Sequence, residues 1–379
     1  MSYEVLCPNC FVDRRGQEKC WSCEWNQLDS GNDFLPLLPH TVLSNNYLIG
    51  RVLGQGGFGI TYVAMDLKKS EKLAIKEYLS TEFAGRSRSN AVIPHSRETR
   101  DLFSKGLLNF REEASELAKL RHASIVTVFD YFEENGTGYL VMEYLGDTTL
   151  SNYLDQNSGK VGYELTKDIL LRIMDGLRAI HARNLYHRDV SPDNICLTPE
   201  ATVKLIDFSA ARYRIAREHP KSLSIIVKDG YAPVEQYYTS GIQGAWTDVY
   251  SLAATMYRAI TGRVPPSSLE RQSHDELVPP RELGVQIPPF AEKAMLRALA
   301  VQAADRYQNV ADFQTALLQS VPDRPPWLFN VLVGAMVLCF VAAIVALSLE
   351  HMGWALSFAV SGVVLIVLFL IQRRNSDSS

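Results

Sequence analysis

The sequence lacks several features that would point to large classes of protein. It has no excess of positive charge, because 42 acidic residues outnumber 38 lysines and arginines and leave a net charge of −4. Nothing therefore favours nucleic acid as a partner, and we expect none. The first residues, starting at Met1, lack the basic start and apolar core of a secretory signal peptide, so we do not expect export by that route.

Cysteine is also scarce, and its distribution is uneven. Of the six cysteines, Cys196 and Cys339 stand alone. The other four form two CxxC pairs within the first 23 residues: Cys7, Cys10, Cys20 and Cys23. Because no export signal accompanies them, these pairs indicate metal ligands rather than disulfides.

The two CxxC pairs predict a structural zinc ribbon over residues 1–28. A nine-residue polar loop separates the pairs, and this spacing lets four thiolates surround one zinc ion tetrahedrally. Residues 1–30 contain too few apolar residues to fold without a bound metal. A four-cysteine site is closed, so we expect no catalysis there, although a ribbon can bind either protein or nucleic acid. A redox dithiol pair and unpaired reduced cysteines are the alternatives. Residues 29–45 are expected to form a linker.

One stretch in the middle of the chain indicates a specific chemistry. Residues 186–194 read Tyr-His-Arg-Asp-Val-Ser-Pro-Asp-Asn, which places the carboxylate of Asp189 five residues before the amide of Asn194. Such a loop can direct a carboxylate at a substrate hydroxyl while the amide holds a metal on a phosphate. The stretch closely resembles the catalytic loop of eukaryotic-type protein kinases, H-R-D-L-K-P-x-N. Ser191 stands where that family has lysine.

Further motifs of the same family occur in the family's order. Residues 54–62 resemble the kinase glycine-rich loop, in which missing side chains let backbone N–H groups approach phosphates. Residues 142–146 resemble the hinge between the kinase lobes. The resemblance implies that ATP is bound by Leu53, Gly54, Gln55, Gly56, Gly57, Phe58, Gly59, Ile60, Thr61, Ala74, Lys76, Glu143 and Leu145.

The resemblance also assigns the charged groups around the phosphates. Residues 73–76 resemble V-A-I-K, so Lys76 would pair with the nucleotide phosphates. Glu113 lies in an E-A-x-x-L frame on a helix and would orient that lysine, with Glu112 and Glu116 as alternatives. Asp207, in a D-F-S sequence resembling D-F-G, would hold magnesium or manganese together with Asn194.

Several local structures are expected between these motifs. Residues 79–106 exceed what the family needs and predict an inserted polar loop, either a docking surface or a solvated insertion. Apolar spacing predicts a helix over 166–184. By resemblance, Asp248 opens a long buried helix and ties down the catalytic-loop backbone. Arg306 is expected to pair with Glu235.

The departure at Ser191 is matched by a second one. The family's lysine hydrogen-bonds a threonine of the activation segment, and that threonine position is Lys228 here. The two family positions touch in the fold, so the sequence indicates an exchange of the ammonium between them. We expect Lys228 to supply the charge beside the phosphate and Ser191 to be its hydrogen-bond partner. The alternative is that Lys228 is a surface charge and phosphate transfer is weak.

The last fifty residues are strongly apolar. Residues 327–349 and 352–371 form two runs of 23 and 20 residues, each long enough to span a bilayer. Flanking arginines predict a hairpin of two transmembrane helices in the cell membrane with both termini, and the 372–379 tail, in the cytoplasm. A re-entrant hairpin or one interfacial segment is the alternative.

Together these features predict an α+β protein with a bilobal protein-kinase fold. The kinase domain is expected over 46–320, with a small lobe over 46–143 and a large lobe over 144–320, between the zinc ribbon and the transmembrane hairpin. The resemblance implies a membrane-anchored bacterial serine/threonine kinase that uses ATP, magnesium or manganese, and structural zinc. Its partners would be protein substrates, including itself by autophosphorylation. A nucleotide-binding pseudokinase scaffold and an adaptor acting through its zinc ribbon are the alternatives.

Overall fold

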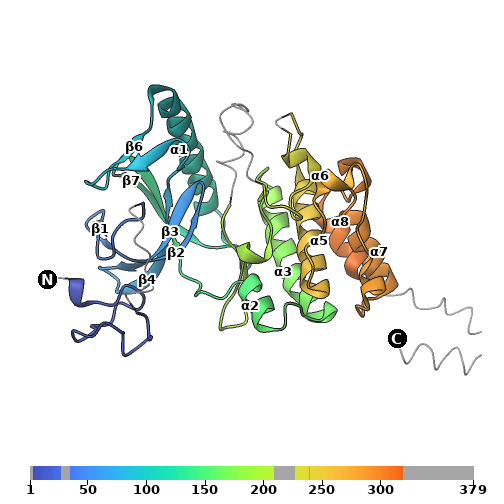
Figure 1. Ribbon diagram of the computed structural model, residues 1–379, viewed down its shortest axis with the longest axis horizontal. Coiled ribbons are helices and arrows are strands. Elements are labelled where there is room, and N and C mark those ends of the chain that lie inside the picture. The colour runs from blue at the N-terminus through green and yellow to red at the C-terminus, as the bar shows by residue number, and fades with distance from the viewer. Residues whose placement is uncertain (1–2, 27–34, 209–226, 239, 319–379) are drawn as a thin grey trace, which may run out of the picture. The chain divides into compact units, whose positions relative to one another are not determined.

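The computed structural model describes residues 3–26, 35–208, 227–238 and 240–318. The chain divides into two units, Met1–Leu318 and Gln319–Ser379, and all described residues belong to the first unit. The described part contains an N-terminal cysteine element, a lobe built around an antiparallel sheet and a largely helical lobe (Figure 1). In the described part, a small cysteine-rich element therefore precedes two lobes.

A six-stranded antiparallel sheet forms the small lobe, in the order β1-β2-β3-β4-β8-β7. Its strands are β1 (Val42–Leu43), β2 (Tyr47–Gly56), β3 (Gly59–Asp66), β4 (Glu71–Tyr78), β7 (Val128–Glu134) and β8 (Thr137–Glu143). The turn between β2 and β3 contains the glycine-rich loop. β4 lies between β3 and β8, where Ala74 is paired with Val63 on one side and Met142 on the other.

The cysteine element packs on this sheet. It begins with the 3₁₀ helix η1 (Tyr3–Val5) and has two antiparallel bridges, Leu6 with Asp13 and Lys19 with Asn26. Phe11 is 93 % buried and packs with Leu48 and Val63 of the sheet. The element therefore shares a small apolar core with the small lobe instead of standing apart from it.

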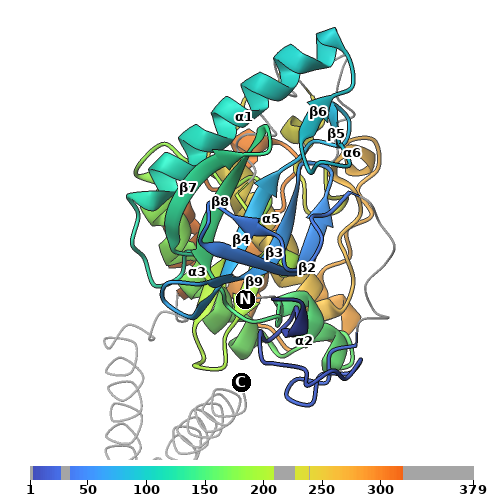
Figure 2. The same cartoon turned by 90° about the vertical axis from the view of Figure 1, so that its left-hand side faces the viewer.

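Residues 79–106 are not the inserted polar loop that the sequence predicts. They form a hairpin of β5 (Ala84–Arg86) and β6 (Val92–Pro94), followed by the start of α1 (Arg97–Ala118). The helix begins early because the Ser96 side chain accepts a hydrogen bond from the backbone of Thr99 in a capping box. Leu102 and Phe103 are buried. Figure 2 shows α1 lying along the sheet with the hairpin near its beginning.

The large lobe is built on α3 and α5, which pack against one another. Its helices are α2 (Leu150–Gln156), α3 (Tyr163–His181), α5 (Ala245–Thr261), α6 (Ser268–Arg271), α7 (Pro289–Ala298) and α8 (Val310–Leu318). Short 3₁₀ segments lie at η3 (Pro192–Asn194), η4 (Val234–Gln236), η5 (Pro280–Leu283) and η6 (Ala303–Asp305), and a hairpin joins β9 (Ile195–Leu197) to β10 (Val203–Leu205). The helix expected over 166–184 is thus present as α3, which both begins and ends three residues earlier than predicted.

The helix α5 shows how the large lobe is held together. It is buried along most of its length, and it ends at Gly262, whose φ of +76° favours glycine. Near its start, Asp248 accepts hydrogen bonds from the backbone N–H groups of His187 and Arg188. The predicted tie between this helix and the loop at 186–194 is confirmed.

The expected fold class needs one correction. Within the described ranges, no helix combines the length and apolar content that a bilayer crossing requires. The longest, α1 and α3, are amphipathic helices with charged residues on one face. The two spans expected at 327–349 and 352–371 lie outside the described residues. The predicted two-helix hairpin and the two-pass membrane localisation built on it are therefore not supported, and the described part has a two-lobed fold with an N-terminal cysteine cluster.

Candidate active site

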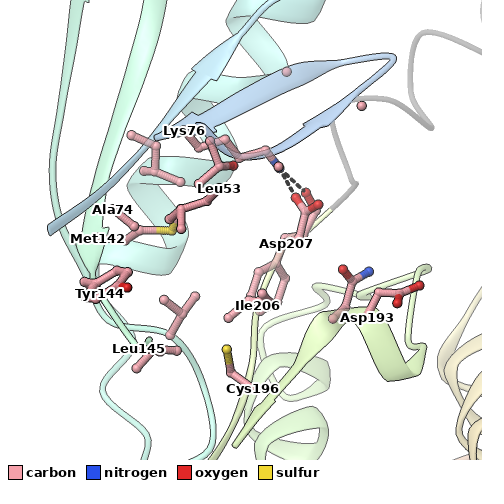
Figure 3. A pocket seen from close by; sticks show the side chains of 18 of the residues that line it. Leu53, Ala74, Lys76, Met142, Tyr144, Leu145, Asp193, Cys196, Ile206 and Asp207 are labelled. Atoms are coloured by element: carbon pink, nitrogen blue, oxygen red, sulfur yellow. Dashed lines mark hydrogen bonds and ion pairs between the residues drawn. The ribbon is translucent and has the colours of Figure 1, made fainter. Parts of the chain in front are cut away.

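A cavity of about 690 Å³ is lined by residues from both lobes. The sheet contributes the glycine-rich loop, β4 and the segment after β8, and the large lobe contributes residues around η3 and β10. Figure 3 shows that the charged side chains gather at one end of this cavity and the apolar ones at the other. The cavity therefore suits a ligand with a flat apolar part and an anionic part.

The apolar end is a slot between the two lobes. Leu53 and Ala74 come from the sheet, Leu145 from the segment after β8, and Cys196 and Ile206 from the large lobe. Burial raises the pKa of Cys196 to about 11, so this thiol is protonated at neutral pH and acts as an apolar wall. A slot of this kind can hold an aromatic base by burial of both of its faces.

At the charged end, Lys76 of β4 forms an ion pair with Asp207. Burial alone would lower the pKa of Lys76, but the carboxylates of Asp207 and Glu113 outweigh it and raise that pKa above the ordinary lysine value. The lysine therefore stays positively charged although most of its side chain is buried. Glu113 comes from α1, so three separate elements meet at this point of the cavity wall.

The loop containing Asp189 and Asn194 faces this charged end. The side-chain N–H of Asn194 donates to the backbone oxygen of Asp189 at 2.7 Å, which fixes the amide and leaves its oxygen as an acceptor. His187 ties the loop to β10, because its Nε2 lies 2.9 Å from the oxygen of Ile206 and its ring packs on Phe208. The loop is therefore held in place on both sides.

Two residues of the site have left-handed backbone conformations. Arg188 has a φ of +66° and Asp207 a φ of +62°, and residues other than glycine rarely adopt such angles. The conformation of Arg188 is held by neighbours on both sides of its peptide unit. The backbone oxygen of Arg188 accepts a hydrogen bond from Gln236 at 2.7 Å, and its N–H donates to Asp248 at 2.7 Å. Strain of this kind is concentrated at functional sites.

Lys228 reaches the same loop from the segment after the undescribed residues 209–226. Its Nζ lies 3.1 Å from the Oγ of Ser191 and forms an ion pair with Asp193. Burial lowers the pKa of Lys228, and the nearby carboxylate of Asp189 opposes that shift. The contact expected between positions 191 and 228 is present, and Asp193 is a third member that the sequence did not indicate. Ser209, of the D-F-S motif, lies outside the described residues.

Most of the residues assigned from the sequence line the cavity. They are Leu53, Gly54, Gln55, Gly56, Gly57, Phe58, Gly59, Thr61, Ala74, Lys76, Glu113, Glu143, Leu145, Asp189, Asn194 and Asp207. Ile60 does not, because alternation along β3 turns its side chain into the core, where it is 99 % buried. Ser191 and Lys228 lie beside the cavity rather than in its wall.

The sequence predicts Glu143 in the cavity wall but not the contacts of its side chain, and it does not indicate Arg51 and Asp147 at all. The side chain of Glu143 accepts hydrogen bonds from the Thr127 backbone at 2.6 Å and from Lys204 at 2.7 Å, so it fastens β8 to the large lobe. Arg51 and Asp147 also line the cavity and form an ion pair. No motif marked them, because this pair joins positions that are 96 residues apart.

The four N-terminal cysteines converge on one point. Their sulfur atoms all lie within 4.8 Å of one another, and none forms a disulfide. Cys7 and Cys23 are 3.7 Å apart and Cys10 and Cys20 are 3.5 Å apart, measured between sulfurs. Tetrahedral zinc with bonds of about 2.3 Å separates its sulfur ligands by about 3.8 Å. The cluster therefore has the dimensions of a four-thiolate zinc site.

Comparisons with known proteins agree with this geometry. Residues 47–323 match the protein kinase domain family, so the chain belongs to this family. A probable serine/threonine-protein kinase of Clostridium acetobutylicum is 30 % identical over 276 residues, which are 71 % of this chain and 39 % of that protein. Serine/threonine-protein kinase PknB of Mycobacterium leprae is 29 % identical over 316 residues, which are 80 % of this chain and 47 % of that protein.

Solved structures show the same fold. The structure titled PpkA-294 apo form is 32 % identical, with a TM-score of 0.66, and the match covers 74 % of this chain and 99 % of that one. The PknI kinase domain of Mycobacterium tuberculosis, at 21 % identity and a TM-score of 0.54, shares the fold. The solved structures thus agree with membership of the protein kinase domain family, and the chain spans less than half the length of the two curated relatives described above.

Proposed function

We propose that the chain is an active kinase that transfers the γ-phosphate of ATP to serine or threonine hydroxyls of proteins, its own included. The observation that carries this proposal is the arrangement at the charged end of the cavity. There the Lys76–Asp207 pair faces the loop that holds Asp189 and Asn194. Phosphoryl transfer needs positioning and charge neutralisation more than covalent help from the protein, and this set supplies both.

The cavity fits ATP at both ends. The adenine fits the slot between Leu53, Ala74 and Leu145, and the phosphates lie under the glycine-rich loop near Lys76. A Cβ atom added at Gly54 or Gly56 would meet no other atom within 4 Å, so the loop has room to move against a ligand. Lys76 then binds phosphate oxygens in place of part of its contact with Asp207.

Asn194 and Asp207 are suited to hold magnesium or manganese, because hard cations prefer amide and carboxylate oxygens. When bound, such a cation neutralises charge on the phosphates. Asp189 aligns the attacking hydroxyl and accepts its proton. The hydroxyl oxygen forms a bond to the γ-phosphorus as the bond from that phosphorus to the bridging oxygen breaks, which gives phosphoprotein and ADP.

In this proposal Lys228 supplies the positive charge that the family places at position 191. Its Nζ approaches the loop that contains Asp189, and the Ser191 hydroxyl, which is fully buried, holds it at 3.1 Å. Asp193 fixes the ammonium from the other side. Because both departures from the family pattern fall on one contacting pair, an exchange of the charge explains them together.

We further propose that the N-terminal cluster binds structural zinc. Cys7, Cys10, Cys20 and Cys23 supply four soft thiolate ligands at spacings that suit tetrahedral zinc. Closure by four protein ligands leaves no position for a substrate, so its role is to hold the ribbon in shape. Metal analysis of the purified chain is expected to give one zinc per molecule, and substitution of Cys7 by serine to remove most of it.

The first prediction tests the activity itself. The full chain, incubated with magnesium and γ-labelled ATP, is expected to label itself and a generic protein substrate. Asp189→Asn keeps the size of the side chain but removes the proton acceptor, so labelling should fall by about 100-fold or more. Asp168→Asn, an exposed change on α3, is the matched control and should keep full labelling.

Three outcomes separate the competing functions. Labelling lost only in Asp189→Asn supports the kinase. Thermal stabilisation of the chain by ATP without any labelling supports a nucleotide-binding scaffold and contradicts the proposal. Absence of both nucleotide binding and labelling, with partner capture that depends on the cysteines, would favour an adaptor.

A further inference from the structure

A loop of the cysteine element touches the cavity wall, and zinc binding and catalysis leave that contact unexplained. The loop is the first CxxC knuckle, in which Pro8 and Asn9 lie between the metal-binding positions Cys7 and Cys10. The backbone N–H of Asn9 points to the Cys7 sulfur at 3.4 Å. Sulfur and any metal bound to it therefore set the position of Asn9.

This knuckle holds Arg51 of β2 at two points. The backbone oxygen of Pro8 accepts a hydrogen bond from the Arg51 N–H at 2.8 Å. The side-chain oxygen of Asn9 accepts one from the Arg51 Nε at 2.7 Å. A second contact of the guanidinium, from Nη1 to the oxygen of Val52, is 3.2 Å long. Arginine presents its donors in a fixed plane, so these contacts fix the direction of its remaining nitrogen.

A bulge and a glycine in β2 allow this contact. The pairing of β2 with β3 jumps from Ile49–Ala64 to Val52–Tyr62, so residues 50 and 51 bulge out of the sheet ladder. The bulge makes the N–H of Arg51 available to Pro8. Gly50 is required beside it, because a Cβ there would lie 2.1 Å from the Pro8 oxygen. The close approach of the knuckle to β2 therefore depends on both the bulge and Gly50.

The remaining nitrogen of Arg51 reaches the other side of the nucleotide cavity. Its Nη2 forms an ion pair with Asp147, which follows β8, and Asp147 also accepts a hydrogen bond from the Tyr144 hydroxyl at 3.0 Å. Arg51, Tyr144 and Asp147 all line the cavity. β2 leads directly into the glycine-rich loop at 54–62, so this pair links the loop that covers the phosphates to the segment beside the base.

We propose that Arg51 is a positioning residue of the nucleotide site and that the first cysteine knuckle, set by its metal, holds it there. Zinc in the ribbon therefore tightens nucleotide binding through Asn9, Arg51 and Asp147. The inference rests on the proposed function in taking the cavity as a nucleotide site and the cysteine cluster as a zinc site; it requires binding, not phosphate transfer. The Asp147 side chain is half exposed, so the pair is worth a modest factor of about two to five in affinity.

The test measures binding of a fluorescent ATP analogue to the full zinc-loaded chain. Arg51→Ala and Asn9→Ala are expected to weaken binding about two- to fivefold while zinc content stays at one per molecule and the thermal midpoint stays within a few degrees. Lys19→Ala is the matched control, because Lys19 lies in the same ribbon and its ion pair with Glu24 is exposed. It should bind nucleotide as the unaltered chain does. In turnover, Arg51→Ala should raise the KM for ATP and leave kcat nearly unchanged.

The decisive measurement combines metal removal with substitution. A zinc-selective chelator, added with magnesium in excess, should weaken nucleotide binding by the unaltered chain by the same factor and should have no further effect on Arg51→Ala. The inference is overturned if chelation acts equally on both proteins, or if Asn9→Ala and Arg51→Ala bind nucleotide as tightly as the unaltered chain. If the unaltered chain binds no nucleotide, the proposed function falls, and this inference with it. Binding without phosphate transfer leaves the inference standing and contradicts only the activity.

Discussion

The pair of Lys228 and Ser191 shows which contacts of a charged residue can be predicted from a sequence motif. Each departs from the kinase pattern, and their side chains lie 3.1 Å apart. The contact could be inferred from the sequence because the two family positions are known to touch. Asp193 could not, because its position is variable in the H-R-D-L-K-P-x-N motif and only the fold brings its carboxylate to the Lys228 ammonium. A motif thus predicts where a charged residue lies but not every partner that fixes its side chain.

The second prediction follows from this pair. Lys228→Ala should lower kcat by about 100-fold or more, since loss of one preorganised charge at a transferring group has an effect of that size. Affinity for ATP should change little, because Lys228 does not line the cavity. Lys228→Arg should keep part of the activity. The double change Ser191→Lys with Lys228→Thr restores the family's arrangement and should recover much of the loss.

The measurement is steady-state phosphate transfer with a parallel binding titration. Lys76→Ala serves as the reference for a site without its phosphate lysine. If Lys228→Ala keeps full transfer while Lys76→Ala abolishes it, Lys228 is only a surface charge and the exchange is rejected.

At the scale of elements, the hairpin β5–β6 and the first turns of α1 differ most from what the sequence predicts. The sequence predicts an inserted polar loop here, either a docking surface or a solvated insertion. Arg86 instead lies in the interior, where it pairs with Glu77 of β4 at 2.5 Å, and both side chains are at most 2 % exposed. Tyr62 and Tyr139 complete the site by donating hydroxyl hydrogen bonds to the same carboxylate. A single buried ion pair produces no periodic pattern in the sequence, so a buried arginine cannot be told from an exposed one.

The third prediction concerns this buried pair. Arg86→Ala leaves the carboxylate of Glu77 without its cation inside the small lobe, which should lower the free energy of unfolding by about 3–5 kcal/mol. Arg111→Ala is the matched control, because the Arg111–Glu133 pair is 3.9 Å long and about half exposed on both sides. That change should cost no more than about 1 kcal/mol.

Urea unfolding of the full chain, followed by circular dichroism, compares the two variants. Equal midpoints for Arg86→Ala and Arg111→Ala would show that the Glu77 site is open to water and would contradict the buried network.

At the scale of the whole described unit, long-range ties decide how the site is held. Arg306 pairs with Glu235 at 2.8 Å, and its side chain is fully buried, so the end of the activation segment is fastened to the last helices. This pair and the tie of Asp248 to the catalytic loop were both predicted from the family resemblance and are confirmed. The seating of the cysteine element on β2 could not be predicted, because it depends on surfaces from two regions that share no motif.

The last prediction uses Asp248, which joins α5, α3 and the catalytic loop. It is fully buried, and it accepts hydrogen bonds from the backbone N–H groups of His187 and Arg188 at 2.9 and 2.7 Å, while His181 Nε2 lies 2.7 Å away. Burial would raise the pKa of Asp248, but these partners outweigh it and hold the pKa below the ordinary value. The folded state therefore binds this proton less readily than the unfolded chain does.

A carboxylate with a lowered pKa stabilises the fold above its unfolded pKa, and that contribution is lost as the pH falls through the lower folded value. Asp248→Asn keeps one acceptor oxygen and should cost about 1–3 kcal/mol at neutral pH for each donor left unpaired. Because asparagine does not titrate, the difference in unfolding free energy between the two proteins should shrink only below about pH 3.9. Asp175→Asn, an exposed change on α3, controls for general charge effects. A difference that stays constant from neutral to acid pH, measured by urea unfolding, would show that Asp248 is not the ionised centre of this tie.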